Sequence, residues 1–257
     1  MLLKQVFARC LRLGDTCLDV GANIGQSAEV LAPLVGPTGQ CHSFECHPIH
    51  YTRLSFLASR PGFENIRPYC RAISDRPGHI VLHTGGDPAA CQASTIIPAL
   101  ATGQRLGSSI ARLKVETDTI DRFCAAHDVS PHMIKIDVEG AEAEVFAGAR
   151  ETFARCLPHV VFEFGYGFDG GQTPYQYNLL RELGYDLYLV DLFQFRGKPF
   201  WVLDEILRIF SIDSEDVRRT QCSGNLFAIH RSKASGPLQG VSILPFADVE
   251  KFRLPAA

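Results

Sequence analysis

The chain has 257 residues, 46% of them hydrophobic, which is enough for one globular domain with a core that folds without a partner. Its formal net charge is −3 and its basic residues form no long run, which excludes the electrostatic surface that nucleic-acid binding requires. The nine cysteines are an odd number without a CxxC pair, so we expect free thiols in a reducing cytoplasm rather than disulfides or a structural zinc ion.

The predicted elements follow one another as strand and helix in turn, which indicates βαβ units and a mainly parallel sheet. The N-terminal 15 residues place basic side chains among apolar ones, unlike a signal peptide, and no later stretch is apolar for long enough to span a bilayer. We expect strands at 17–20, 40–45, 66–69, 133–137, 160–164, 186–190 and 225–230. We expect helices after Ile24, after Pro48, and over 119–126, 141–153 and 174–183.

Two segments interrupt this alternation. Residues 85–109 are rich in Gly, Ala, Ser and Thr, a composition typical of a functional or disordered loop. Residues 192–222 contain four aromatic side chains and then an amphipathic stretch from Leu203 to Phe210, for which we favour a helix packed on the core. A lid over a substrate, a dimer face or a membrane-surface helix are the alternatives. We therefore expect a single domain over 1–231 with these two inserts, and a loosely packed tail at 232–257.

The most specific local pattern is the turn after the first strand, Asp19-Val20-Gly21-Ala22-Asn23-Ile24-Gly25. It stands where a nucleotide-binding turn stands, between a strand and a helix, and its glycines let the backbone approach a ligand. Asn23 and Gln26 occupy positions where a dinucleotide fingerprint needs glycine. The Asp19 carboxylate would repel a pyrophosphate but attract a cation, and S-adenosylmethionine carries both a sulfonium and an α-ammonium. An ordinary Gly-rich turn is the alternative.

Further candidate cofactor contacts follow the second and third strands. Glu45 ends the second strand, where a carboxylate can accept two hydrogen bonds from a ribose diol, and Cys46 follows it. The alternative for Glu45 is a surface residue ahead of the helix that begins at Pro48. Arg71 and Ala72 follow the third strand, where the adenine edge lies in folds of this kind, an assignment that rests on topology alone.

The fourth strand carries ionisable residues where a buried strand is normally apolar. Lys135, Asp137 and Glu139 alternate and therefore share one face. Such a face indicates either a buried ion-pair network or the mouth of an active site, and its position at the carboxyl ends of the strands favours the site. Glu163, in the next strand, directs another carboxylate to the same edge. The alternative for Glu163 is a structural ion pair with Lys135.

Four strings together resemble the FkbM family of methyltransferases: the turn at 19–25, Phe44-Glu45, Asp118-Thr-Ile-Asp121 and Ile134-Lys-Ile-Asp-Val-Glu-Gly-Ala-Glu142. The resemblance covers roughly residues 14–165. It implies a Rossmann-like class I methyltransferase fold: a mostly parallel seven-stranded sheet, helices on both faces and an antiparallel last strand. It also implies S-adenosylmethionine as the donor and O-methylation of a hydroxyl on a sugar, polyketide, lipid or other natural product. Family members commonly pass from Phe-Glu directly into proline, whereas here Cys46 and His47 intervene.

On this interpretation the protein aligns donor and acceptor for an in-line methyl transfer. Asp137, Glu139 or His47 would take the proton of the acceptor, and Lys135 would orient a carboxylate or hold the acceptor oxygen. Asp137 could instead bind the ammonium of the cofactor. The expected cofactor contacts are Asp19, Gly21, Ala22, Asn23, Gly25, Glu45, Cys46, Arg71, Ala72 and Asp137. The expected catalytic residues are Lys135, Asp137, Glu139 and Glu163.

Other interpretations stay open at this point. Asp137, Glu139 and Glu163 could together bind magnesium, but the ammonium of Lys135 on the same face competes with a metal ion, so we expect none. Glu142 and Glu144 begin the following helix and are interpreted as helix-dipole and solvent residues. The alternatives for function are a non-catalytic cofactor-binding module that acts through a partner, and an NAD-dependent oxidoreductase. A homodimer is possible, and the pattern does not name the acceptor.

Overall fold

The computed structural model describes residues 2–85, 94–107, 109–165, 174–195, 198–199, 207–216 and 223–252. The chain forms two compact units. The first unit is Arg12–Leu157, and the second unit combines Met1–Leu11 with Pro158–Ala257. The expectation of one domain over 1–231 with a separate tail stays a prediction. No helix within the described ranges is both long enough and apolar enough to cross a membrane.

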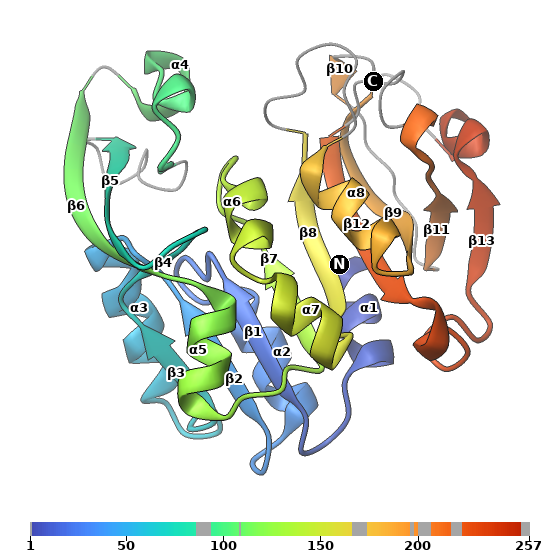
Figure 1. Cartoon of the computed structure of the whole chain (residues 1–257), viewed down its shortest axis with the longest axis horizontal. Helices are drawn as coiled ribbons and strands as arrows, with labels where there is room; N and C mark the ends of the chain where they lie inside the picture. The colour runs from blue at the N-terminus through green and yellow to red at the C-terminus, as the bar shows by residue number, and fades with distance from the viewer. Residues whose placement is uncertain are drawn as a thin grey trace. The chain divides into compact units, whose positions relative to one another are not determined.

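The main sheet of the first unit has four parallel strands in the order β7-β1-β2-β3 (Figure 1). The strands are β1 (Thr16–Val20), β2 (Gln40–Phe44), β3 (Ile66–Tyr69) and β7 (Met133–Ile136). β7 is buried at all its positions, as a strand covered on both faces must be. This is the mainly parallel, Rossmann-like arrangement that the sequence predicts, and four of its predicted strands are confirmed.

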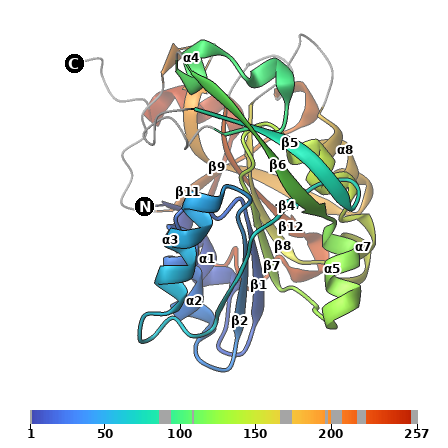
Figure 2. The same ribbon diagram turned by 90° about the vertical axis from the view of Figure 1, so that its left-hand side faces the viewer.

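Helices cover both faces of this sheet: α2 (Ala28–Val35), α3 (Pro48–Ala58), α5 (Ile120–His127), α6 (Glu142–Ala147) and α7 (Arg150–Cys156). Figure 2 shows α2 and α3 on one side of the strands and α5 on the other. The helix expected over 141–153 is broken in two at Gly148. A Cβ atom there would lie 2.2 Å from the carbonyl oxygen of Ser74, so the chain bends where only glycine fits against that backbone.

A second, three-stranded sheet in the first unit was not predicted. It has the order β4-β6-β5, with β4 (Ala72–Ile73), β5 (Gly78–Gly85) and β6 (Ile110–Asp118). β5 and β6 pair in antiparallel fashion along their whole length, and several residues of each strand are exposed. Because many of the exposed positions are polar, neither strand is a continuous apolar run in the sequence. Of the expected loop at 85–109, the described part contains η2 (Pro98–Leu100) and the short helix α4 (Gly103–Leu106). Residues 86–93 and 108 lie outside the described residues.

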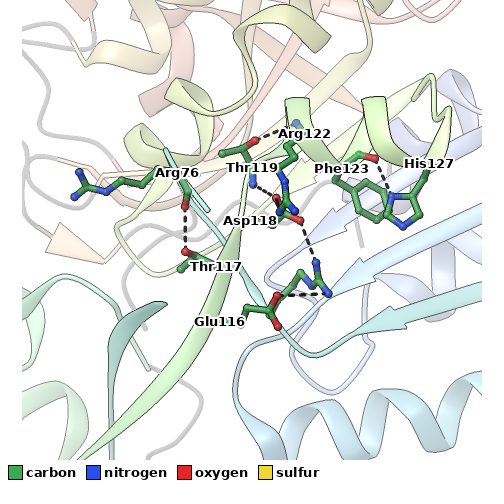
Figure 3. Close-up of polar contacts among 9 residues, drawn as sticks. Arg76, Glu116, Thr117, Asp118, Thr119, Arg122, Phe123 and His127 are labelled. Carbon is green, nitrogen blue, oxygen red and sulfur yellow. Dashed lines mark hydrogen bonds and ion pairs between the residues drawn. The ribbon is translucent and has the colours of Figure 1, made fainter. Parts of the chain in front are cut away.

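Asp118 joins the small sheet to α5. Its buried carboxylate pairs with the Arg71 guanidinium at 3.0 Å and with the Arg122 guanidinium at 2.9 Å, and it accepts a hydrogen bond from the Thr119 backbone N–H at 2.9 Å. The Thr119 hydroxyl in turn caps α5 by accepting from the N–H of Arg122 (Figure 3). These contacts fix the end of β6 and, through Arg71, the chain segment that follows β3.

The sheet of the second unit has the order β13-β11-β9-β12-β8, with β10 added to β9. Its strands are β8 (His159–Phe164), β9 (Tyr185–Phe195), β10 (Lys198–Pro199), β11 (Arg208–Ser211), β12 (Ser223–His230) and β13 (Ser242–Pro245). The unit also contains α1 (Leu2–Cys10) and α8 (Tyr175–Glu182). β12 runs antiparallel to both β8 and β9, which confirms the predicted antiparallel strand. The strands of the two units exceed the predicted seven.

Two expectations for the C-terminal half are wrong. The amphipathic stretch expected as a helix ends in strand β11, where Ile209 and Phe210 are buried, and Leu207 just before the strand is buried too. Residues 200–206 lie outside the described residues. A stretch of so few apolar residues fits the helical and the strand period alike. The tail is not loosely packed over 232–252, because β13 pairs with β11 and Val249 is buried.

Candidate functional site

A cleft lies in the first unit at the carboxyl ends of β1, β2 and β7. Open α/β sheets bind ligands at this edge. The predicted cofactor residues that line it are Gly21, Ala22, Asn23, Glu45, Cys46, Arg71 and Ala72. Three predicted catalytic residues line it too: Lys135, Asp137 and Glu139.

The turn after β1 is packed tightly against the end of β7. Gly21 has φ 76°, and a Cβ atom there would lie 1.8 Å from the carbonyl oxygen of Asp137, so the two backbones touch. The N–H groups of Gly21 and Ala22 both donate to the carbonyl oxygen of Phe44, at 3.0 and 2.9 Å. Gly25, which was expected to contact the cofactor, does not line the cleft. A Cβ atom at this position would lie 2.6 Å from the side chain of Leu57 in α3. Gly25 therefore serves helix packing.

Glu45 closes the turn from the β2 side. Glu45 is 8% exposed, so the alternative of a surface residue is wrong. One oxygen accepts from the N–H of Asn23 at 2.8 Å and the other from the N–H of His47 at 2.7 Å. Burial raises the pKa of Glu45, while these two N–H groups act in the opposite direction. Each carboxylate oxygen keeps a second lone pair for a ligand in the cleft.

Lys135 is a buried cation that contacts two carboxylates and a backbone carbonyl. Its ammonium lies 3.4 Å from an oxygen of Asp19 and 3.3 Å from an oxygen of Asp137, and it donates to the carbonyl oxygen of Gly21 at 3.1 Å. Burial lowers the pKa of Lys135, but the two carboxylates outweigh it and raise that pKa overall. Burial also raises the pKa of Asp19, against the opposing effect of Lys135.

The two carboxylates differ in their access to the cleft. Asp19 is fully buried and does not line the cleft, so its expected contact with the cofactor stays a prediction. It lies opposite Lys135 on the neighbouring strand, and its carboxylate is 3.4 Å from the Lys135 ammonium. The Asp137 side chain is 39% exposed and lines the cleft. The Lys135 ammonium therefore pairs with one buried carboxylate, Asp19, and with one that lines the cleft, Asp137, whose catalytic role stays a prediction.

The chain leaves β7 through an unusual turn. Glu139 has φ 56°, in the left-handed region that few non-glycine residues adopt. Glu142 accepts from the N–H groups of Val138 and Gly140 at 3.2 and 3.3 Å. Only 3% of Glu142 is exposed, and burial raises the pKa of its carboxyl to about 7. The interpretation of Glu142 as a solvent residue is therefore wrong.

The cleft also has an apolar wall, which sequence reasoning found only in part. Ala72 was predicted, but the buried Leu82 and Ile96 were not. Leu82 comes from the unpredicted strand β5, and Ile96 from the segment 85–109, which the sequence indicated as a functional or disordered loop. An apolar wall of this kind can pack against a flat heterocycle.

Two further candidates are placed differently. His47 is 4% exposed and does not line the cleft, whereas His50, whose ring centroid is 4.6 Å from that of His47, does. Burial lowers the pKa of His50 to about 4, so its imidazole is neutral at pH 7. Glu163 belongs to the second unit, where it lies on β8 opposite Asn225 of β12. Its part in the site stays a prediction.

The chain is similar to known methyltransferases. Residues 19–187 match the family described as methyltransferase FkbM domain. The 2-O-methyltransferase NoeI of Sinorhizobium fredii is 26% identical over 159 residues, which are 59% of this chain and 64% of NoeI, so the chain spans less than two thirds of that relative. The 31-O-demethyl-FK506 methyltransferase FkbM of Streptomyces tacrolimicus is 29% identical over 198 residues, covering 63% of this chain and 73% of that protein. The solved methyltransferase FkbM of Methylobacillus flagellatus KT has a TM-score of 0.40 and 17% identity, covering 58% of this chain and 32% of that one.

The Lys135 network predicts that two substitutions differ in their cost to stability. Lys135→Met leaves the buried Asp19 carboxylate without its cation and should lower the free energy of unfolding by about 3–5 kcal/mol. Asp137→Asn acts at a partly exposed group and should cost less than about 1 kcal/mol. Urea denaturation measures both, with Glu29→Ala as the control, because the Glu29 side chain is 56% exposed. Equal losses in the two variants would contradict the division between a buried and an accessible carboxylate.

Glu142 predicts a pH dependence of stability. The pKa of the Glu142 carboxyl is about 7 in the folded chain and near 4.5 in its ordinary state. At pH values between these two, the carboxyl is therefore protonated in the folded chain and ionised in the unfolded chain. Its contribution to stability is therefore complete below about pH 4.5 and is lost as the pH rises through 7, by at most about 3 kcal/mol. Glu142→Gln, which cannot ionise, should remove this loss. Urea denaturation at pH 5 and pH 8 tests it against Glu29→Gln, and an unchanged pH dependence in Glu142→Gln would refute it.

Proposed function

Because the chain belongs to the FkbM family of methyltransferases, we propose that its cleft binds S-adenosylmethionine and that it methylates a hydroxyl of a small acceptor, such as a sugar, a polyketide or a lipid. The observation that carries the proposal is the position of Glu45. It is a buried carboxylate at the end of β2, fixed by two backbone N–H groups and facing the same cleft as the turn after β1. This is the place of a ribose-binding carboxylate in a Rossmann-like fold.

The residues of the cleft fit this cofactor. The apolar wall of Ala72, Leu82 and Ile96 suits the adenine ring, and Glu45 suits the ribose diol. Asp137 brings a carboxylate to the cleft that suits a cationic amino-acid portion. The turn lacks the glycines that a pyrophosphate needs at Asn23 and Gln26, which argues against the alternative of an NAD-dependent enzyme.

The bound cofactor supplies an electrophilic methyl group on its sulfonium. The chain aligns the acceptor with that group and excludes water, as transfers between two bound reactants require. Glu139 and, as the alternative to its role at the cationic portion of the cofactor, Asp137 are the candidates to accept the proton of the acceptor hydroxyl. The Lys135 ammonium lies 3.3 Å from the Asp137 carboxylate and orients that carboxylate in the cleft.

Oxygen as the methylated atom is supported by the names of the relatives. One is a 2-O-methyltransferase and the other acts on 31-O-demethyl-FK506. We extend this chemistry to the present chain, together with an acceptor that offers an alcohol rather than a nucleic-acid base. The formal charge of −3 is consistent with a small-molecule acceptor.

The cofactor proposal predicts selective binding. S-adenosylhomocysteine should raise the melting temperature of the protein, and NAD should not. Glu45→Ala should weaken S-adenosylhomocysteine binding by about 1.5–3 kcal/mol, the value of hydrogen bonds to a charged group. Isothermal calorimetry measures both affinities, with Glu29→Ala as the control at an exposed carboxylate. Wild-type affinity in Glu45→Ala would remove Glu45 from the site.

The acceptor proposal predicts turnover without a metal. A panel of sugars, hydroxylated polyketides and lipids, supplied with S-adenosylmethionine, should include a compound that yields S-adenosylhomocysteine and a methyl ether. Because the Lys135 ammonium competes with a metal ion beside Asp137, the rate should survive EDTA. Loss of activity in EDTA with recovery in magnesium would contradict metal independence. Cofactor binding without product for any acceptor would favour the non-catalytic module.

A further inference from the structure

The turn that carries Glu139 into the cleft needs support from outside itself. Glu139 adopts φ 56° and Gly140 follows with φ 100°, so two successive residues are left-handed. A glutamate in this region is strained and persists only where surrounding contacts determine the backbone. Val138 and Glu139 both line the cleft, so the shape of this turn is part of the shape of the site.

Glu142 supports the turn from its C-terminal side. A single carboxylate oxygen of Glu142 accepts from the N–H of Val138 at 3.2 Å and from the N–H of Gly140 at 3.3 Å. The side chain is 3% exposed, so water does not compete for these donors. The two N–H groups flank Glu139, and their shared acceptor keeps them pointing to the same place.

Thr95 supports the turn from the other side. Its hydroxyl donates to the carbonyl oxygen of Glu139 at 2.8 Å and accepts from the N–H of Ile97 at 3.1 Å. Thr95 is 1% exposed, and its backbone forms a pair of hydrogen bonds with His83 of β5, at 2.8 and 2.9 Å. The contact therefore ties the turn after β7 to the second sheet of the first unit.

We infer that Thr95 and Glu142 are positioning residues that form one clamp on the turn at 138–140 and so direct Glu139 into the cleft. The inference rests on the proposed cofactor site for its functional part, since the clamp shapes one wall of that site. Neither residue lines the cleft, so each acts through the turn rather than on a ligand. Thr95 and Glu142 bind opposite ends of the same strained unit, the carbonyl of Glu139 and the N–H groups beside it.

Amide hydrogen exchange of the full chain without ligand tests the clamp directly. In Thr95→Val, which keeps the side-chain shape and loses the hydroxyl, peptides spanning the turn should exchange about 5-fold faster, the factor for one ordinary hydrogen bond. Thr95→Ser should restore the wild-type rate. Thr117→Val is the matched control, because Thr117 is also buried and donates to a backbone carbonyl, that of Arg76, at 3.0 Å. Unchanged exchange in Thr95→Val would overturn the clamp.

A second pair of variants keeps the test independent of Thr95. Glu142→Leu removes the acceptor and should speed exchange of the same turn, whereas Glu142→Gln keeps an acceptor oxygen and should not. Calorimetry with S-adenosylhomocysteine should then show dissociation constants about 5-fold higher in Thr95→Val and Glu142→Leu than in their conservative counterparts. Faster exchange with unchanged affinity would overturn the positioning role. Failure of the wild-type chain to bind S-adenosylhomocysteine would instead overturn the proposed function, while the exchange data, taken without ligand, would still decide the clamp.

Discussion

A buried ammonium ion, that of Lys135, joins the ends of two neighbouring central strands. Burying a lysine with two aspartates costs a large desolvation free energy, which is offset only when the geometry is good and the remaining donors find acceptors. Here the ammonium contacts Asp19 on β1, Asp137 after β7 and the carbonyl oxygen of Gly21. The same cation therefore holds the turn after β1 and the turn after β7 in one place, and the cleft between those turns depends on it.

Around this ion pair, the acidic groups of the site are fixed by backbone N–H groups rather than by mobile side chains. Glu45 accepts from Asn23 and His47, and Glu142 accepts from Val138 and Gly140. Close backbone contact at Gly21 removes further freedom. A site of this kind is organised before a ligand enters, so little binding free energy is lost in ordering it.

The polar and apolar sides of the cleft come from different parts of the first unit. The carboxylates follow the parallel strands β2 and β7, while the apolar wall comes from β4, β5 and the segment after it. Asp118 and Thr95 connect the two parts, the first through Arg71 and the second through Glu139. The membership in the FkbM family applies to residues 19–187, which include all these groups.

The local sequence pattern was sufficient to predict the parallel strands, because continuous apolar runs bounded by turns are typical of buried strands. It was also sufficient to single out the turn at 19–25 and Glu45, because each lies at the end of a predicted strand. It also predicted that Lys135, Asp137 and Glu139 lie together, and all three line the cleft, although the strand ends before Asp137. Only the folded chain decided which carboxylate a ligand can reach: Asp19 is fully buried and does not line the cleft, whereas Asp137 lines it, although both contact Lys135. Likewise, the sequence positions of Thr95, Leu82 and Glu142 did not reveal their contacts. Hydrogen bonds and packing between residues distant along the chain depend on the tertiary structure. The short periods of helix and strand do not encode that structure.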